Sequence, residues 1–141
     1  MTKINIFINN VSKARKRTAI VFMEDELKST ITEFNANNVK IIDCCDLVTN
    51  EIIFSDDQLL KLIFDTTVGI KSLISNLELL IAPRMNEHQF LKSFIQKLIV
   101  KEPLESVFIL FYSKILYEKF KNFYKNYQPT EFHFLDNLEE A

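Results

Sequence analysis

Short apolar runs alternate with segments of helical periodicity along the whole chain, and this alternation restricts the fold more than any other feature of the sequence. Four apolar runs, at residues 19–22, 39–45, 77–82 and 107–112, are expected to be strands, with an alternating edge strand at residues 131–135. Strands that alternate with helices predict a sheet with right-handed crossovers and helices on both faces. We therefore expect an α/β fold with a three-layer, doubly wound, mostly parallel sheet.

The helices expected between these strands are defined by their apolar spacing and by their end signals. An i, i+3, i+4, i+7 spacing predicts an amphipathic helix with a basic end within residues 1–17, although Ile4-Asn5-Ile6 would also fit the start of a strand. Further helices are expected near residues 26–35, after the S-x-x-Q capping box at 55–58, after the cap signal at 86–89, and at 114–127. The apolar face of the helix after the capping box is expected to contain Leu59, Leu60, Ile63, Phe64 and Ile70.

Length and composition predict one domain. The 141 residues, 48% of them hydrophobic, suffice for a single core over residues 1–141, with a frayed acidic tail at 136–141. A net charge of −2 gives no overall attraction to nucleic acid or to an anionic membrane. No apolar stretch reaches the length of about 18 residues that a membrane span needs, and the first residues lack the pattern of a secretory signal. We expect a cytoplasmic protein.

Gly69 is the only glycine in the chain. Glycine-rich turns between a strand and a helix let the backbone approach a phosphate or an oxyanion, because glycine has no Cβ and adopts left-handed angles. No complete GxxxxGK[ST], GxGxxG or GxSxG sequence is present. The commonest nucleotide and hydrolase sites are therefore not expected, and we predict neither catalytic residues nor a cofactor.

The chain after the first expected strand partly matches a phosphate loop. In residues 22–29, Lys28 and Ser29 occupy the lysine and hydroxyl positions of GxxxxGK[ST], but neither glycine position holds glycine. In an intact loop the lysine would reach the β- and γ-phosphates and the hydroxyl would hold Mg²⁺. Here the Glu-Asp-Glu sequence at residues 24–26 would repel a triphosphate. We interpret Lys28 and Ser29 as a vestigial phosphate-binding pair; the alternative is an ordinary helix start capped by Asp25.

Two further segments accompany this incomplete loop. The N-terminal helix ends in a basic cluster at residues 13–17, and residues 75–80 have the sequence Ser-Asn-Leu-Glu-Leu-Leu. Together the three features resemble the small P-loop ATPase-like subunit of bacteriophage-exclusion (BREX) defence systems, whose second acidic motif is of the Asp-Asn-Ile-Glu-Leu-Leu type. Asn76 and Glu78 match this motif, whereas Ser75 replaces the metal-assisting Asp. The resemblance implies a P-loop-NTPase- or Rossmann-like fold without an intact P-loop, in a degenerate relative that does not hydrolyse ATP.

A receiver domain of response regulators is a second resemblance. Residues 20–26 are similar to the first strand and acidic pair of such a domain, and residues 18–135 have about its length. The strand at 77–82 should then end in the phosphate-accepting Asp, but Pro83 and Arg84 follow it. The lysine expected near the last strand is also absent. This resemblance implies at most a pseudo-receiver domain.

Metal binding is not expected from the cysteines and histidines. The chain has two residues of each type, and none has a C-x-x-C or H-x-x-x-H spacing. Cys44 and Cys45 are expected to point to opposite faces of a strand as reduced, buried thiols. Asp43 and Asp46 flank them and would either bind a cation or serve as loop and cap residues.

The basic cluster is the strongest local candidate for binding. Lys13, Arg15, Lys16 and Arg17 are four cations within five residues, and such a cluster binds nucleic-acid phosphates. The lysines of residues 114–125 would extend the patch if the fold brought both segments together. The alternative is a solvated helix end.

These observations favour a non-catalytic accessory or interaction subunit on a degenerate nucleotide-binding scaffold. It would act through a protein partner or a homo-oligomer, in a bacterial anti-phage defence complex or another nucleic-acid-handling complex. One alternative is a small nucleotide- or nucleic-acid-binding regulatory protein that uses Lys28, Ser29 and the basic cluster. The other is the pseudo-receiver domain. An enzyme and a membrane protein are not expected.

Overall fold

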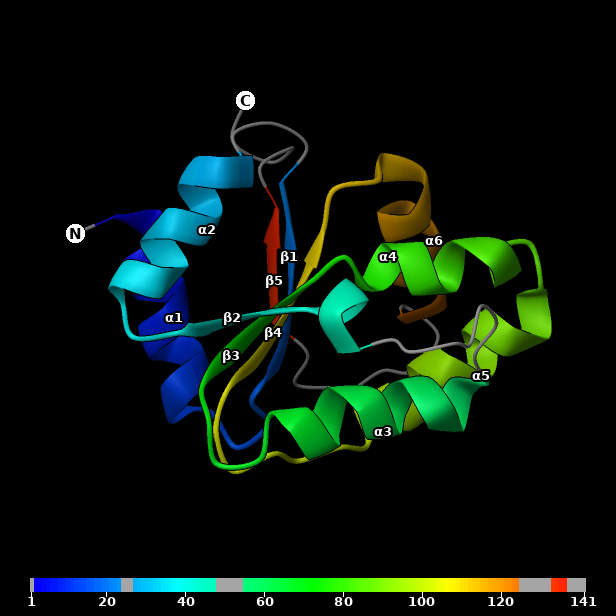
Figure 1. Ribbon diagram of the computed structural model, residues 1–141, viewed down its shortest axis with the longest axis horizontal. Helices are drawn as coiled ribbons and strands as arrows, with labels where there is room; N and C mark the ends of the chain where they lie inside the picture. Colours follow the sequence, from blue (N-terminus) through cyan, green and yellow to red (C-terminus); the bar gives the residue numbers. More distant parts are fainter. Residues whose placement is uncertain (1, 24–26, 48–54, 125–132, 137–141) are drawn as a thin grey trace.

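The described residues form one parallel sheet of five strands with helices on both faces (Figure 1). The structure is a computed structural model, and it describes residues 2–23, 27–47, 55–124 and 133–136. The strands are β1 (Thr18–Phe22), β2 (Lys40–Asp43), β3 (Ser72–Ser75), β4 (Val107–Phe111) and β5 (His133–Asp136). Their order in the sheet is β2-β3-β4-β1-β5, and all neighbours in this order are parallel. The expected three-layer α/β fold is confirmed.

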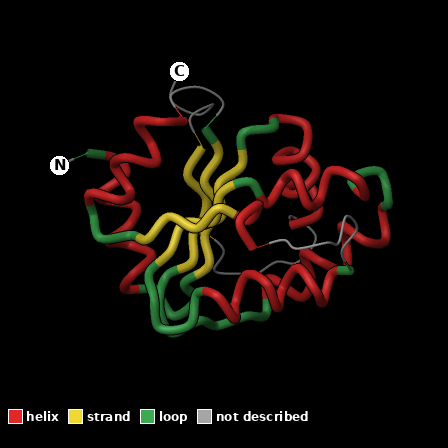
Figure 2. The backbone as a smooth tube through the Cα atoms, viewed as in Figure 1, coloured by secondary structure: helices red, strands yellow, loops and turns green. Residues whose placement is uncertain are grey.

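The direction of the chain connections explains how the helices divide between the two faces. The connection from β1 to β2 crosses the sheet in one direction, and the later connections return in the other. Right-handed crossovers therefore place α2 (Leu27–Ala36) on one face and α3 (Asp56–Thr66), α5 (His88–Ile99) and α6 (Lys114–Tyr124) on the other. α1 (Lys3–Lys13) lies beside α2, and Figure 2 shows the two helical layers on either side of the strands.

Strands β1 and β4, in the interior of the sheet, are buried on both faces, since their side chains alternate between two apolar cores. Ala19 and Val21 of β1 belong to the core beneath α1 and α2, while Ile20 and Phe22 belong to the core beneath α3, α5 and α6. All five residues of β1 and all five of β4 are buried. This is the pattern of a parallel sheet that is covered by helices on both sides.

Local end signals account for two of the helix starts. Thr2 caps α1, because its side chain accepts a hydrogen bond from the Asn5 N–H at 3.2 Å. The predicted capping box before α3 is confirmed: Ser55 Oγ accepts from the Gln58 N–H at 3.1 Å, and Gln58 Oε1 accepts from the Ser55 N–H at 2.8 Å. These bonds satisfy N–H groups that have no partner within the helix.

The third strand lies earlier in the chain than the sequence predicts. Residues 77–82, expected as a strand, instead form the helix α4 (Leu77–Ile81) and the start of the 3-10 helix η2 (Ala82–Arg84). A short apolar run fits a buried strand or a buried helix equally well, and here Leu77, Leu80 and Ile81 are buried at helical spacing. Asn76 turns the chain from β3 into α4 with a left-handed φ of 62°, which asparagine tolerates better than most residues.

Cys44 and Cys45 do not lie in a strand, so that prediction is wrong. β2 ends at Asp43, and the next residues form the 3-10 turn η1 (Cys44–Leu47). The Asp43 carboxylate accepts a hydrogen bond from the Cys45 N–H at 2.9 Å, which fixes this turn. Both thiols are free. Cys44 is buried, which raises the pKa of its thiol to about 12, whereas Cys45 is exposed.

Several element ends also differ from the predictions. α3 ends at Thr66, so Ile70 lies in the turn that follows and not on the helix. α1 ends at Lys13, so the rest of the basic cluster lies in the loop to β1. The expected cap signal before α5 gives no side-chain cap, since Glu87 precedes the helix without such a hydrogen bond. Asp136, expected to begin the frayed tail, is the last residue of β5. The predictions for residues 24–26, 125–132 and 137–141 lie outside the described residues.

Candidate functional site

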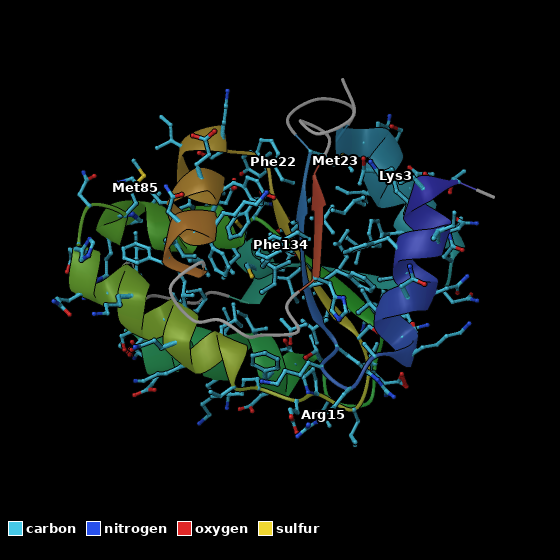
Figure 3. The ribbon with its side chains drawn as sticks, turned by 180° about the vertical axis from the view of Figure 1, so that it is seen from behind. Lys3, Arg15, Phe22, Met23, Met85 and Phe134 are labelled. Carbon is cyan, nitrogen blue, oxygen red and sulfur yellow. The ribbon has the colours of Figure 1, made fainter. Side chains whose placement is uncertain are left out.

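The carboxyl edge of the sheet, where β1 to β4 end, is the usual ligand site of a doubly wound fold. β1 and β4 are neighbours in the sheet, but the connection after β1 leads to α2 on one face and the connection after β4 leads to α6 on the other. Ligands of such folds bind between two strands whose connections lead to opposite faces. Phe22 and Met23 lie at this edge in Figure 3, and the Met23 N–H donates to the Phe111 carbonyl at 3.0 Å. Both side chains are buried and apolar.

The predicted phosphate-binding pair lies in the first turn of α2. Lys28 and Ser29 are exposed and line a shallow hollow with Thr32, Glu33 and Ala36, which lie one and two turns further along the same helix. The Thr32 hydroxyl donates to the Lys28 carbonyl at 2.9 Å. The described contacts therefore place this pair along the outer side of α2. Phosphate binding by Lys28 and Ser29 stays a prediction.

A cluster of hydrogen-bonded side chains joins the ends of β2, β3 and β4. The Asn76 amide donates to Asp43 Oδ1 at 2.9 Å, and the Tyr112 hydroxyl donates to Asn76 Oδ1 at 3.1 Å. The hydrogen bond from Asn76 holds the pKa of Asp43 below its ordinary value. Burial, with the charge of Glu78 as a smaller cause, raises the pKa of Tyr112. These groups satisfy one another, so Asn76, a residue that matches the BREX motif, has a visible structural role.

Glu78, the other matching residue, is 4% exposed and holds the turn between β4 and α6. Its Oε1 accepts from the backbone N–H groups of Tyr112 and Ser113, at 2.8 and 2.9 Å. Burial raises the pKa of Glu78, against the opposing effect of these two donors. Within the described residues, Oε2 has no hydrogen-bond partner. The Glu78 carboxylate therefore stabilises the backbone of the connection between β4 and α6.

The sequence leaves two roles open for Asp43 and Asp46, a cation site or loop and cap residues, and Asp43 takes the second in the structure. Its Oδ1 accepts from both Asn76 and the Cys45 N–H. Within residues 2–23, 27–47, 55–124 and 133–136, no group of three or more His, Cys, Asp or Glu side chains is arranged to hold a metal ion. In the structure Asp43 thus stabilises the turn after β2 and the hydrogen-bonded cluster with Asn76.

The basic cluster lies at the opposite, amino edge of the sheet, and Figure 3 shows Arg15 at the far end from Phe22 and Met23. Arg17 supports the loop, because its Nε donates to the Ala14 carbonyl at 3.0 Å and its Nη1 donates to the Leu104 carbonyl. Arg15 Nε lies 3.5 Å from Glu102 Oε1. Lys13 and Arg15 are exposed.

The lysines of residues 114–125 would extend this patch only if the fold brought the two segments together, and it does not do so for Lys114. Lys114 opens α6 directly after β4, at the carboxyl edge, whereas the basic cluster precedes β1 at the amino edge. α6 also covers the face of the sheet opposite α1 (Figure 1). The strand order thus puts the basic cluster and the start of α6 at opposite edges of the sheet. Net charge and residue spacing in the sequence cannot reveal this separation.

A pocket at the amino edge was not predicted. It has a volume of about 290 Å³ and lies where the turn after α3 meets the loop before β4. The lining residues of this amino-edge pocket are Phe64, Thr67, Val68, Gly69, Lys101, Glu102, Pro103 and Leu104. Gly69 has a φ of 70°, a conformation that favours glycine. The available sequence signal was one apolar residue, Leu104, in a segment expected to be a loop. Val68 was expected within the helix after the capping box, and it lies in the turn that follows α3.

The strand order bears on the resemblance to a receiver domain. Flavodoxin-like sheets, to which receiver domains belong, have the order 2-1-3-4-5. The sheet described here has the order β2-β3-β4-β1-β5, and the segment expected to end in the acceptor position is the helix α4. The structure gives no support to a pseudo-receiver domain.

The protein is thus a three-layer α/β protein with a parallel sheet. At the carboxyl edge of this sheet, polar side chains form hydrogen bonds with one another and with nearby backbone groups. Comparisons of the chain with protein-family models, with curated proteins and with solved structures give no match. Among the described helices, none combines the length and the apolar character that crossing a membrane requires.

Proposed function

We propose that the protein is a non-catalytic interaction subunit built on a degenerate nucleotide-binding scaffold. One observation supports the proposal: within the described part of the chain, polar side chains at the carboxyl edge form hydrogen bonds that stabilise the protein's own turns. Asn76 bridges Asp43 and Tyr112, and Glu78 holds the backbone that leads into α6. Phosphoryl transfer depends on groups that position phosphates and hold Mg²⁺. Groups already used to fix turns are poorly suited to that task.

Ser75 adds to this argument. It ends β3 at the position that corresponds to the metal-assisting Asp of the BREX subunit, and it is buried. A neutral hydroxyl attracts Mg²⁺ less than a carboxylate does, because Mg²⁺ sites use carboxylates together with phosphate oxygens. The resemblance of residues 13–17 and 75–80 supports a place in a bacterial anti-phage defence complex or another nucleic-acid-handling complex.

Calorimetric titration of the purified protein with Mg²⁺-ATP tests the proposal, with Lys28→Ala as the matched variant. We expect no binding heat up to millimolar ATP in either protein. Micromolar binding that Lys28→Ala abolishes would overturn the proposal, since residues 22–29 would then work as a phosphate loop. Isolation of the tagged protein from its own cells after nuclease treatment is expected to yield a stoichiometric protein partner.

A nucleic-acid-binding regulatory protein is a second candidate, favoured by the exposed cations Lys13 and Arg15 at the amino edge. This function predicts salt-sensitive retention of DNA or RNA, because bound cations release counterions from the phosphates. The double variant Lys13→Ala/Arg15→Ala tests it and leaves Arg17, which supports a loop, in place. Equal retention by the wild type and the double variant would rule out this surface.

A further inference from the structure

The amino-edge pocket has walls that are fixed by contacts within the protein. The buried Thr67 hydroxyl donates to the Ile63 carbonyl at 2.8 Å, and the Ile70 N–H donates to the Thr67 carbonyl at 3.1 Å, which closes the turn around Gly69. On the other wall, Arg17 donates to the Leu104 carbonyl. Both segments run along the same edge of the sheet in Figure 1. A partner that binds here therefore spends little free energy on ordering the loops.

Apolar side chains are unusually exposed around this pocket. Val68 is 72% exposed and Leu104 is 81% exposed. Val100 and Ile70, in the same two segments, are also among the exposed large hydrophobic residues of the described part of the chain. Single exposed apolar residues are ordinary, but a group of them in one place marks an interaction surface.

The described loops at the amino edge carry more cations than carboxylates, although the whole chain has a net charge of −2. The four described loops that lead into β1 to β4 are residues 14–17, 37–39, 67–71 and 100–106. Two of their residues are carboxylates, Glu102 and Glu105, and Glu102 faces Arg15 at 3.5 Å. The cations of these loops are Arg15, Lys16, Arg17, Lys71 and Lys101. This excess of cations complements an acidic partner.

Lys101 brings charge and apolar surface together. It lines the pocket, and its Nζ lies 5.7 Å from the centre of the Phe64 ring, within the range of a cation–π contact. The pocket volume of about 290 Å³ is at the lower limit for small-molecule sites, which measure about 300 to 1,000 Å³. The size suits one large side chain of a bigger partner.

We infer that the amino-edge pocket docks an acidic peptide segment of a partner protein, with one large apolar side chain seated between Val68 and Leu104. Carboxylates that flank this anchor lie near Lys101 and Arg15. The inference rests on the proposed function, that the protein acts through protein contacts, and it names the chemistry of the partner.

Nucleic acid fits this surface less well. Single strands bind along basic grooves and stack their bases on exposed aromatic rings. Here the aromatic side chain is Phe64, which is half-buried beneath Lys101, and the exposed groups at the pocket are the aliphatic Val68 and Leu104. Arg17 is engaged with two backbone carbonyls. Binding of an apolar side chain from a partner would bury the exposed aliphatic residues Val68 and Leu104, whereas binding of phosphates would give them no role.

The test is selection of a random peptide library, displayed on phage, against the full-length folded protein. We expect enriched sequences in which Asp and Glu flank one Leu, Ile, Phe or Met. A labelled peptide of the most enriched sequence is then titrated by fluorescence anisotropy. Binding should weaken about tenfold or more in Leu104→Ser and in Lys101→Glu, as for anchor contacts. Ile115→Ser is the matched control, since Ile115 is 63% exposed on α6, and it should leave binding unchanged.

Several outcomes would overturn the inference: no enrichment, enriched sequences without acidic residues, or binding that Leu104→Ser does not weaken. Salt-sensitive binding of a single-stranded oligonucleotide that needs Arg15 but not Leu104 would also overturn it. These failures differ from failure of the proposed function. A native partner that Leu104→Ser still retains contradicts the pocket only, whereas micromolar Mg²⁺-ATP binding through Lys28 contradicts the proposed function.

Discussion

The two edges of the sheet use polar and apolar groups in opposite ways. At the carboxyl edge Asp43, Asn76 and Glu78 direct their polar atoms at neighbouring side chains and backbone. At the amino edge Val68 and Leu104 leave apolar surface in water. Fold class points to the first edge for function, since parallel sheets bind ligands there. The exposed apolar side chains favour the second, where we infer that a partner docks, because shared topology alone does not decide where a given member of these folds binds.

The largest effect is expected from Glu78→Ala. This substitution removes the acceptor of two N–H groups, those of Tyr112 and Ser113, in a partly buried turn. Leaving such donors without a partner costs about 3 kcal/mol of unfolding free energy. Urea denaturation measures the loss, and Glu78→Gln, which keeps one acceptor oxygen, should lose less. Wild-type stability in Glu78→Ala would mean that the carboxyl edge is not held as described.

Asn76→Ala is expected to cost about 2 kcal/mol, through two lost side-chain hydrogen bonds and a left-handed backbone that alanine disfavours. Asn76→Gly loses the same bonds but tolerates the backbone angle. Denaturation of both variants separates the two causes, since the glycine variant should be the more stable. Equal stability would assign the whole effect to the hydrogen bonds.

The pH dependence of the unfolding free energy tests the carboxyl edge further, and the expected change is smaller than that of Asn76→Ala. The pKa of Glu78 is raised in the folded protein, so its contribution is complete below the ordinary glutamate pKa of about 4.3. It is lost as the pH rises through the raised pKa, because the unfolded carboxyl releases its proton more readily. The unfolding free energy of the wild type relative to Glu78→Gln should therefore fall with rising pH in that window. A rise would contradict the assigned direction.

Leu104→Ser should change the unfolding free energy least, by about 0.5 kcal/mol or less, as for exposed positions without special contacts. Its side chain is 81% exposed, and the hydrogen bond to Arg17 uses its backbone carbonyl. Thermal and urea denaturation check this. A loss as large as that of Asn76→Ala would mean that the leucine supports the loop, and the contrast between the edges would disappear.

The sequence predicted those parts of the fold that carry a periodic signal. β1 and β4 are apolar on both faces, and Ser55 with Gln58 marks the start of α3. β3 was missed because this four-residue strand begins and ends with serine, while the following α4 is the more apolar segment. For the candidate site, the motif match identified Glu78 but not its role. That role depends on the place of α4 beside β4, which spacing along the chain does not reveal.

The place of β1 within the sheet has a consequence for how the chain is made. The described partners of β1 are β4 and β5, which follow it late in the sequence, whereas β2 and β3 pair with each other as near neighbours. During synthesis β1 and its apolar side chains emerge from the ribosome long before β4 exists. Pairing between distant segments slows folding and leaves strand edges open to other chains. The nascent protein thus carries β1, an interior strand of the final sheet, without its partner strands until most of its residues have been translated.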